Sequence, residues 1–256
     1  GQLILRRPEF QMEQRLLLDK INLEKGTVLV EGEEYPLKEK NFPTLDKDNP
    51  YELTPEEQDV VERMVQAFTN CERLQRHIRF LYARGSLYKV YNGNLLYHGC
   101  VPFNEDGSFT KVNIYGKEYS GKALYDVLEH YARKGYFAVE PEEKQKGLDI
   151  LWFIWENANS PVFGKSKMTT FEPYFIEDKA THKEPKNPYY KLLDREDIVN
   201  RILAEFGLPI EGSHIINGHI PVESKKGESP VKCNGKLLII DGGFSKAYQP
   251  KTGIAG

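Results

Sequence analysis

The chain has 256 residues, of which 39% are hydrophobic and 29% are charged. A chain of this size and composition can bury a sizeable core, as one large domain or as two small ones. Its 35 basic and 38 acidic residues leave a net charge of −3, so the protein as a whole attracts neither nucleic acid nor an anionic membrane surface. We therefore expect no nucleic-acid partner and no membrane partner.

The sequence carries no targeting signal that we can identify. No apolar run approaches the length of a membrane span, and the start, GQLILRRPEFQME, lacks the apolar core and cleavage site of a signal peptide. The cysteines Cys71, Cys100 and Cys233 stand at unrelated spacings, which is typical of reduced thiols rather than of disulfides or a zinc cluster. These features predict a cytoplasmic protein. Both ends are abrupt, so we expect the chain to be truncated at both.

Residues 1–85 are expected to form a mixed, mainly helical segment. GTVLVEGEEYPL alternates like a small hairpin. TPEE then has the features of a helix start, with Thr54 as the cap and Glu57 reaching back as a capping box. An apolar stripe over residues 60–68 continues on a second helix to Leu81, and such a stripe is typical of helices that pack on a core.

From residue 86 the pattern becomes that of strands. Asn92-Gly93 in LYKVYNGNLLYHG is the strongest short hairpin signal, and KVNIYGKEY suggests another hairpin. Helical periodicity follows over residues 122–134 and again from Pro141.

An aromatic cluster, Trp152, Phe153 and Trp155, lies on the helix that starts at Pro141. We expect it to belong to the core, the alternative being an interface with an absent part of the protein or another subunit. HKEPKNPYY is Pro-rich and polar, which predicts a surface connection, and Asp194 is expected to cap the helix that follows it.

The last part of the chain is again strand-like. HIING is followed by VKCNGKLLIIDGG, a second Asn-Gly hairpin whose KLLII is apolar enough to be buried on both faces. Helices around strands of this kind predict an α/β fold, with a layered arrangement over residues 86–256.

Two histidines stand in the same sequence pattern. His98 follows the strand-like NLLY, His219 follows HIING, and each adjoins a glycine with a proline shortly after. A single histidine of this kind, like His214, is commonly a hydrogen-bonded core residue. Two of them at the ends of separate strands face the crevice where α/β sheets bind ligands, and they could converge on one metal ion. The paired pattern therefore favours a metal site.

These motifs resemble those of a known superfamily. LLYHGCVPFNEDGSF resembles the histidine motif of the calcineurin-like metallophosphoesterases, and INGHIPV with CNGKLLIIDGGFS is similar to their late Gly-His motif. The wider run, including HIRFLYARGSLYKVYNGNLLYHG, SPVFGKSKMTTFE and KLLIIDGGFSKAYQPKTGIAG, resembles the class III fructose-1,6-bisphosphatases of bacteria over nearly the whole chain. The resemblance implies the C-terminal portion of a longer enzyme, with residues 86–256 as part of a layered sandwich of mixed sheets flanked by helices.

The resemblance also implies a reaction. That family hydrolyses fructose 1,6-bisphosphate to fructose 6-phosphate and phosphate in gluconeogenesis, with a hydroxide activated by two ions of Mn²⁺ or Mg²⁺. By resemblance, His98 and His219 bind the same ion. The Asp-x-His, Gly-Asp-x-x-Asp and Gly-Asn-His motifs that supply the other ligands are absent from this sequence, and no catalytic residue is identified. We expect this chain alone to bind divalent ions weakly or not at all and to be inactive.

A sugar bisphosphate also requires cations beyond the metals. GKSKMTTFE offers Lys165 and Lys167 between the two histidine motifs, where related phosphatases carry a phosphate-binding cation, although solvated lysines are the commoner case. Arg79, Arg84 and Lys89 are alternatives.

Two further residues are expected to shape the site. Asp241 ends a buried strand and could be a ligand or a general acid, but a hydrogen bond within the turn is the simpler role; Asn217 precedes the Gly-His pair.

Other functions remain open: a phosphoprotein phosphatase, or a non-catalytic interaction module that keeps the fold. Truncation exposes apolar surface, which favours self-association.

Overall fold

The computed structural model describes residues 1–242, 245–247 and 249–253, and the chain divides into two compact units. The first unit comprises residues 1–85 and 167–184, and the second comprises residues 86–166 and 185–256. The sequence predicted a division after residue 85 and did not assign the segment 167–184 to the first unit. This segment lies in the first unit, where Ile176 forms an antiparallel bridge with Leu37.

The first unit contains a three-stranded antiparallel sheet. Its strands are β1 (Ile21–Asn22), β2 (Thr27–Val30) and β3 (Glu33–Pro36). The expected hairpin between β2 and β3 is confirmed: Glu31 and Gly32 have φ of 51° and 90°, the positive values that the tight turns of such hairpins require. The core under this sheet consists of Leu17, Val28, Val30, Leu37 and Ile176.

Short helices surround that core. They are α1 (Gln2–Arg6), α6 (Phe171–Phe175) and the 3₁₀ turns Pro8–Phe10, Glu13–Arg15 and Leu18–Lys20. Arg15 and Glu172 tie two of them together through an ion pair with Nη1 and Oε1 2.7 Å apart.

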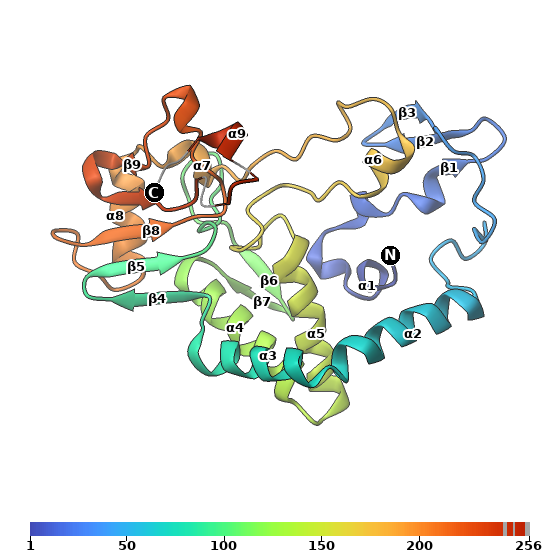
Figure 1. The fold of residues 1–256 in the computed structure, drawn as a ribbon, viewed down its shortest axis with the longest axis horizontal. Coiled ribbons are helices and arrows are strands. Elements are labelled where there is room, and N and C mark those ends of the chain that lie inside the picture. Colours follow the sequence, from blue (N-terminus) through green and yellow to red (C-terminus); the bar gives the residue numbers. More distant parts are fainter. Residues whose placement is uncertain (243–244, 248, 254–256) are drawn as a thin grey trace. The chain divides into compact units, whose positions relative to one another are not determined.

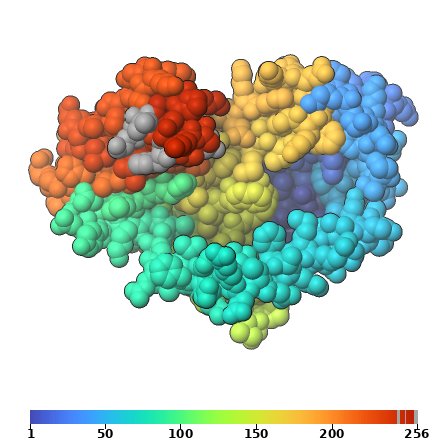
Figure 2. Space-filling view, in the orientation of Figure 1, coloured from blue at the N-terminus to red at the C-terminus, as the bar shows by residue number. Residues whose placement is uncertain are grey.

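Two longer helices, α2 (Pro55–Thr69) and α3 (Glu72–Arg84), complete the first unit. The predicted capping box is present, since Thr54 accepts from the Glu57 backbone N–H and Glu57 accepts from that of Thr54. The prediction that their apolar stripe packs on a core is wrong for this structure: neither helix has a buried residue, and Phe68 is 63% exposed. Figure 2 shows these helices, in cyan, as surface.

The second unit is built on a five-stranded mixed sheet. Its strands, in spatial order, are β4 (Tyr88–Tyr91), β5 (Asn94–Tyr97), β8 (His214–Asn217), β10 (Leu237–Ile239) and β9 (Val231–Lys232) (Figure 1). The central strands β5, β8 and β10 run parallel, whereas β4 and β9 are antiparallel to their neighbours. Both Asn-Gly hairpin predictions are thereby confirmed.

One face of this sheet forms the main core. Leu95, Ile215 and Leu237, one from each parallel strand, are fully buried against α8 (Glu196–Glu205), where Ile198 and Ile202 are fully buried too. The opposite face is more open: Leu238 is half-buried and Ile240 is 54% exposed, so the prediction that KLLII is buried on both faces is wrong.

Helices α4 (Gly121–Phe137) and α5 (Pro141–Glu156) form a tightly packed pair in the second unit (Figure 1). A Cβ added at Gly147 would lie 2.0 Å from the backbone nitrogen of Gly135, so this close approach requires glycine. The aromatic cluster of α5 is only partly core: Phe153 is buried, but Trp155 is 61% exposed because it lies on the other side of the helix.

The remaining elements of the second unit are short. They are β6 (Val112–Ile114) and β7 (Lys117–Tyr119), which form the predicted hairpin, with α7 (Tyr189–Leu192), α9 (Gln249–Thr252) and the 3₁₀ turns Ser224–Lys226 and Cys233–Gly235. Helix α8 begins after Arg195 and has no side-chain cap, so the prediction of an Asp194 cap is wrong. No helix in the described part of the chain is long and apolar enough to cross a membrane.

Candidate functional site

The parallel strands of the second unit end at one edge of the sheet. His98 directly follows β5, Gly218 and His219 directly follow β8, and Asp241 comes shortly after β10. The register pairs Leu96 with Ile216, and therefore the ends of β5 and β8 lie side by side. This is the edge at which parallel α/β sheets bind ligands.

The structure brings the two histidines together at this edge. His98 Nε2 lies 2.9 Å from His219 Nδ1, and the ring centroids are 4.8 Å apart with the planes inclined at 66°. His98 is exposed, whereas His219 is half-buried. One nitrogen of each imidazole therefore points into the same small volume.

A main-chain carbonyl fixes the tautomer of His219. Its Nε2 lies 2.7 Å from the oxygen of Phe163, and because a carbonyl only accepts, Nε2 must donate its proton there. When the ring is neutral, Nδ1 presents its lone pair toward His98. Burial, followed by the charge of His98, lowers the pKa of His219 below its ordinary value of 6.5, which favours the neutral ring.

The turns that carry the histidines are tied to each other. Gly218 N–H donates to the carbonyl of His98 at 2.9 Å, and His219 adopts a left-handed backbone with φ of 68°. Cys100 N–H donates to Pro161, against which Gly99 packs so closely that a Cβ would lie 2.5 Å from the Pro161 oxygen. The loop after α5 therefore supports both histidines.

The two candidate lysines have different surroundings. Lys167 is buried in the first unit, where its Nζ lies 2.5 Å from Glu31 Oε1. Lys165 is half-buried in the second unit with Nζ 6.0 Å from the centre of the Phe163 ring, and its positive charge contributes to the lowered pKa of His219.

The residues expected to shape the site act in different ways. Asn217 is buried, and its Nδ2 donates to the Gly99 carbonyl and to the Tyr189 hydroxyl, both at 2.9 Å. Asp241 is half-buried and its backbone carbonyl accepts from Val222 N–H at 2.8 Å, while its carboxylate charge opposes the lowering of the His219 pKa. Asp241 thus holds its turn through the main chain.

The donor set fits part of a metal site. Two imidazole nitrogens converge, and one ring is held in the tautomer that a ligand requires by an acceptor behind it. Among the described residues, however, no group of three or more His, Cys, Asp and Glu side chains could hold a metal ion. The described part of the chain therefore offers two converging imidazole nitrogens, which are too few for a complete metal site.

The sequence did not identify two of the residues at this site. Phe163 acts through its backbone, which no residue pattern reveals, although its place in SPVFG next to the candidate lysines marked the loop. Tyr189 lies in HKEPKNPYY, which was expected to be a surface connection, yet Tyr189 is fully buried. The adjacent tyrosines Tyr189 and Tyr190 at the end of this polar stretch were the signal that could have indicated burial.

The other histidines lie outside this site. His214 is exposed, with Nδ1 2.9 Å from the Gly235 carbonyl, so the expectation that it is a core residue is wrong, although it is hydrogen-bonded. His77 and His130 are exposed, and His182 Nε2 lies 2.9 Å from the Ile176 carbonyl oxygen.

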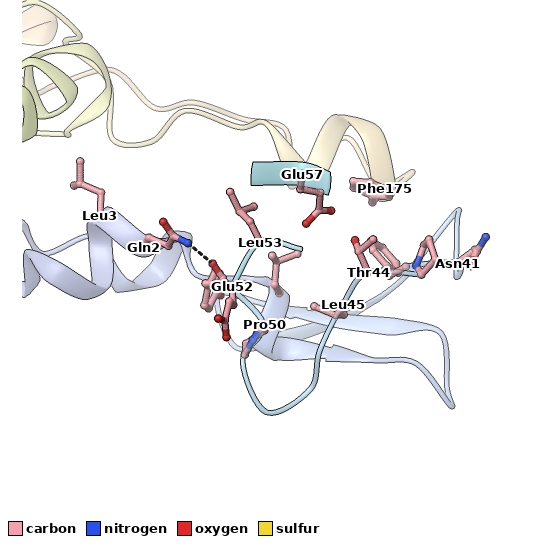
Figure 3. Close-up of a pocket in the computed structure, with 15 residues that line it drawn as sticks. Gln2, Leu3, Asn41, Thr44, Leu45, Pro50, Glu52, Leu53, Glu57 and Phe175 are labelled. Carbon is pink, nitrogen blue, oxygen red and sulfur yellow. Dashed lines mark hydrogen bonds between the residues drawn. The ribbon is translucent and has the colours of Figure 1, made fainter. Parts of the chain in front are cut away.

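A separate pocket of about 480 Å³ lies in the first unit (Figure 3). Its wall is mostly apolar, with Leu3, Leu53 and Phe175 among its residues, and Gln2 donates to the Tyr51 carbonyl at its side. None of the site residues predicted from the sequence lines it.

The fold and the site together define an α/β protein with paired imidazoles at the carboxyl edge of a mixed sheet. The chain belongs to the Firmicute fructose-1,6-bisphosphatase family, whose family model matches residues 1–256. The resemblance to these bisphosphatases predicted from the motifs is confirmed.

Named relatives agree with this assignment. The chain is 58% identical over 257 residues to a "Fructose-1,6-bisphosphatase class 3" of Clostridium botulinum (strain Langeland / NCTC 10281 / Type F), covering 100% of this chain and 38% of that relative. A protein of the same name from Clostridium tetani (strain Massachusetts / E88) is also 58% identical, with 39% of its length covered. The chain thus spans well under half the length of these relatives, and its expected C-terminal placement is not confirmed. No solved structure matches.

Proposed function

We propose that this chain is part of a metal-dependent phosphomonoesterase that hydrolyses fructose 1,6-bisphosphate to fructose 6-phosphate and phosphate. The observation that carries the proposal is the approach of His98 Nε2 to within 2.9 Å of His219 Nδ1, in a chain of the fructose-1,6-bisphosphatase family. The mixed sheet with histidines at its carboxyl edge supports a further proposal, that the second unit is part of a calcineurin-like layered sandwich.

His98 and His219 are the proposed ligands of one ion. Divalent ions such as Mn²⁺ or Mg²⁺, bound as a pair, would lower the pKa of a water and neutralise charge at phosphorus. Phe163 keeps a proton of His219 on Nε2, and partial burial lowers the pKa of the ring, which favours the neutral form with a lone pair on Nδ1. The protein's contribution is therefore two converging imidazoles, one of which, His219, is oriented with its lone pair on Nδ1.

Lys165 is the better candidate of the two lysines for binding a substrate phosphate. It belongs to the same unit as the histidines and acts electrostatically on His219, whereas Lys167 is paired with Glu31. Phosphate oxygens are strong acceptors for an ammonium group.

We further propose that this chain by itself is inactive and acts within a longer protein. Two histidine ligands do not complete a dinuclear centre, and the chain covers 38% of a relative's length. A role in gluconeogenesis in the cytoplasm belongs to the same proposal.

The test is a titration of the full-length protein with Mn²⁺ alone, together with phosphate release from fructose 1,6-bisphosphate. His98→Ala and His219→Ala are expected to weaken Mn²⁺ binding and to abolish turnover. His214→Ala is the matched control, because this histidine is exposed on β8 and contacts only a backbone carbonyl among the contacts described above.

Three outcomes would contradict the proposal. Wild-type Mn²⁺ affinity in both histidine variants would remove the metal role. Hydrolysis of a phosphopeptide but not of the sugar bisphosphate would select a phosphoprotein phosphatase. Absence of both activities in a full-length protein that binds Mn²⁺ would favour a non-catalytic module.

A further inference from the structure

A buried polar cluster lies behind the two histidines. It consists of Tyr97, the last residue of β5, Asn217, the last residue of β8, and Tyr189 at the start of α7. These side chains are 6%, 1% and 0% exposed, respectively. Because buried polar groups are costly unless they are hydrogen-bonded, a cluster of this kind is maintained only where its contacts are made.

The Tyr189 hydroxyl is the centre of the cluster. It lies 2.7 Å from the Tyr97 hydroxyl and accepts from Asn217 Nδ2 at 2.9 Å. Tyr97 precedes His98, and Asn217 lies two positions before His219. A single buried hydroxyl therefore joins the two strand ends that carry the histidines.

The orientation of the Asn217 amide follows from its second contact. Nδ2 lies 2.9 Å from the Gly99 carbonyl, and since a carbonyl only accepts, the atom facing it must be the NH₂ group. With both of its protons used, this group fixes the carbonyl of the Gly99–Cys100 peptide, one residue beyond His98. Gly218 N–H holds the His98 carbonyl in the same way.

The remaining atom of the amide, Asn217 Oδ1, is buried and has no hydrogen-bond partner among the described residues. An unpaired buried acceptor lowers the stability of a fold, so stability alone does not account for an asparagine at this position. A role in placing the histidine turns explains why the amide is held here.

We propose that Asn217, held by Tyr189, is a positioning residue that sets His98 relative to His219 for metal binding. This inference rests on the proposed metal role of the two histidines. Asn217 contacts no reacting atom; it acts by holding the Gly99 peptide, and thereby His98, at the end of β5. Loss of the amide donors lets the His98 turn move, so the two imidazoles no longer present their nitrogens to one ion.

The experiment uses metal-free full-length protein titrated with Mn²⁺ alone. Asn217→Leu removes the donors at similar volume, and we expect an affinity loss of about 10- to 100-fold, typical of residues that orient metal ligands. Tyr189→Phe removes one hydroxyl, and we expect a loss of about twofold to tenfold. Tyr190→Phe is the matched control: its hydroxyl is buried one position further on and is not among the contacts of Asn217, so wild-type affinity is expected.

A second readout separates positioning from general destabilisation. At saturating Mn²⁺ the KM for fructose 1,6-bisphosphate is expected to be unchanged in Asn217→Leu, and excess Mn²⁺ is expected to restore most of the kcat. Wild-type Mn²⁺ affinity in Asn217→Leu, or an equal loss in Tyr190→Phe, would overturn the inference. If His98→Ala and His219→Ala bind Mn²⁺ with wild-type affinity, the proposed function fails. If these two variants lose affinity but Asn217→Leu does not, the proposed function stands and only the positioning role of Asn217 fails.

Discussion

Arg15 and Glu172 stand 157 residues apart in the chain, yet they form a two-pronged ion pair inside the first unit. Nη1 and Nη2 of the arginine donate to Oε1 and Oε2 of the glutamate at 2.7 and 3.0 Å, and Nη2 also donates to the Met168 carbonyl. The glutamate side chain is fully buried. The pair fastens α6, and with it the segment 167–184, to the start of the chain.

Removing one member of this pair should be strongly destabilising. Arg15→Met leaves a buried, unpaired carboxylate, and we expect the free energy of unfolding to fall by about 3–5 kcal/mol. The measurement is urea unfolding at neutral pH. In the double variant Arg15→Met with Glu172→Gln, most of that loss should be recovered, because no buried charge is left; two additive losses would argue against the coupling.

Low pH should weaken the same pair. Burial raises the pKa of Glu172, but the hydrogen bonds and charge of Arg15 outweigh it and hold the pKa below the ordinary value of 4.5. The stabilisation is therefore present above pH 4.5 and is lost as the pH falls through the lowered value. Unfolding followed from pH 6 to pH 3 should show a steeper loss of stability in the wild type than in Glu172→Gln.

His219 predicts a second pH dependence, in the metal-free protein. Its pKa is lowered by burial and then by the charge of His98, so the unfolded chain binds a proton more readily than the folded one. Its contribution to stability is full above pH 6.5 and is lost as the pH falls through the lowered folded-state value. Urea unfolding between pH 8 and pH 5 measures the slope, and His219→Asn should reduce it. An unchanged slope would show that the ring is not held neutral by the fold.

Gly99 should not tolerate a side chain. A Cβ there would lie 2.5 Å from the Pro161 oxygen, a backbone atom that cannot turn aside. We expect Gly99→Ala to lower the free energy of unfolding by about 1–3 kcal/mol, as overpacking does. Gly218→Ala is the control on the facing turn, because its Cβ would be 3.4 Å from the nearest atom, and thermal or urea unfolding should show a much smaller loss. Equal losses of stability in Gly99→Ala and Gly218→Ala would show that the contact with the Pro161 oxygen is not the cause.

The capping box of α2 predicts a local effect. Thr54→Ala removes the acceptor for the Glu57 N–H and should cost the helix about 0.5–2 kcal/mol. Because no residue of α2 is buried, packing does not hold the helix when the cap is lost. Faster amide hydrogen exchange in α2, restored by Thr54→Ser, is the expected result. Unchanged exchange in the alanine variant would mean that other contacts fix this end.

Local signals in the sequence predicted most of the strands and helix starts. Asn92-Gly93 and the Thr54–Glu57 box each fix backbone geometry over a few residues, and both appear as predicted. The convergence of His98 and His219 was predicted from their shared position after a strand. It requires only that β5 and β8 be parallel neighbours, which the structure confirms.

The rest depended on long-range packing that residue patterns do not contain. Periodicity shows which face of α2 is apolar, but it does not show whether another element covers that face. On α5 the apolar residues run around the helix, so Trp155 and Phe153 could not be assigned to different environments without the neighbouring helix. Lys167 looked like a loop cation because its partner, Glu31, is 136 residues away.

The acceptor that orients His219 is the main-chain oxygen of Phe163. Every residue type carries that oxygen, so a mutation at position 163 can replace the aromatic ring without deleting the atom that the imidazole needs. Substitutions at position 163 are therefore expected to leave the hydrogen bond to His219 in place, provided that the loop keeps its backbone path.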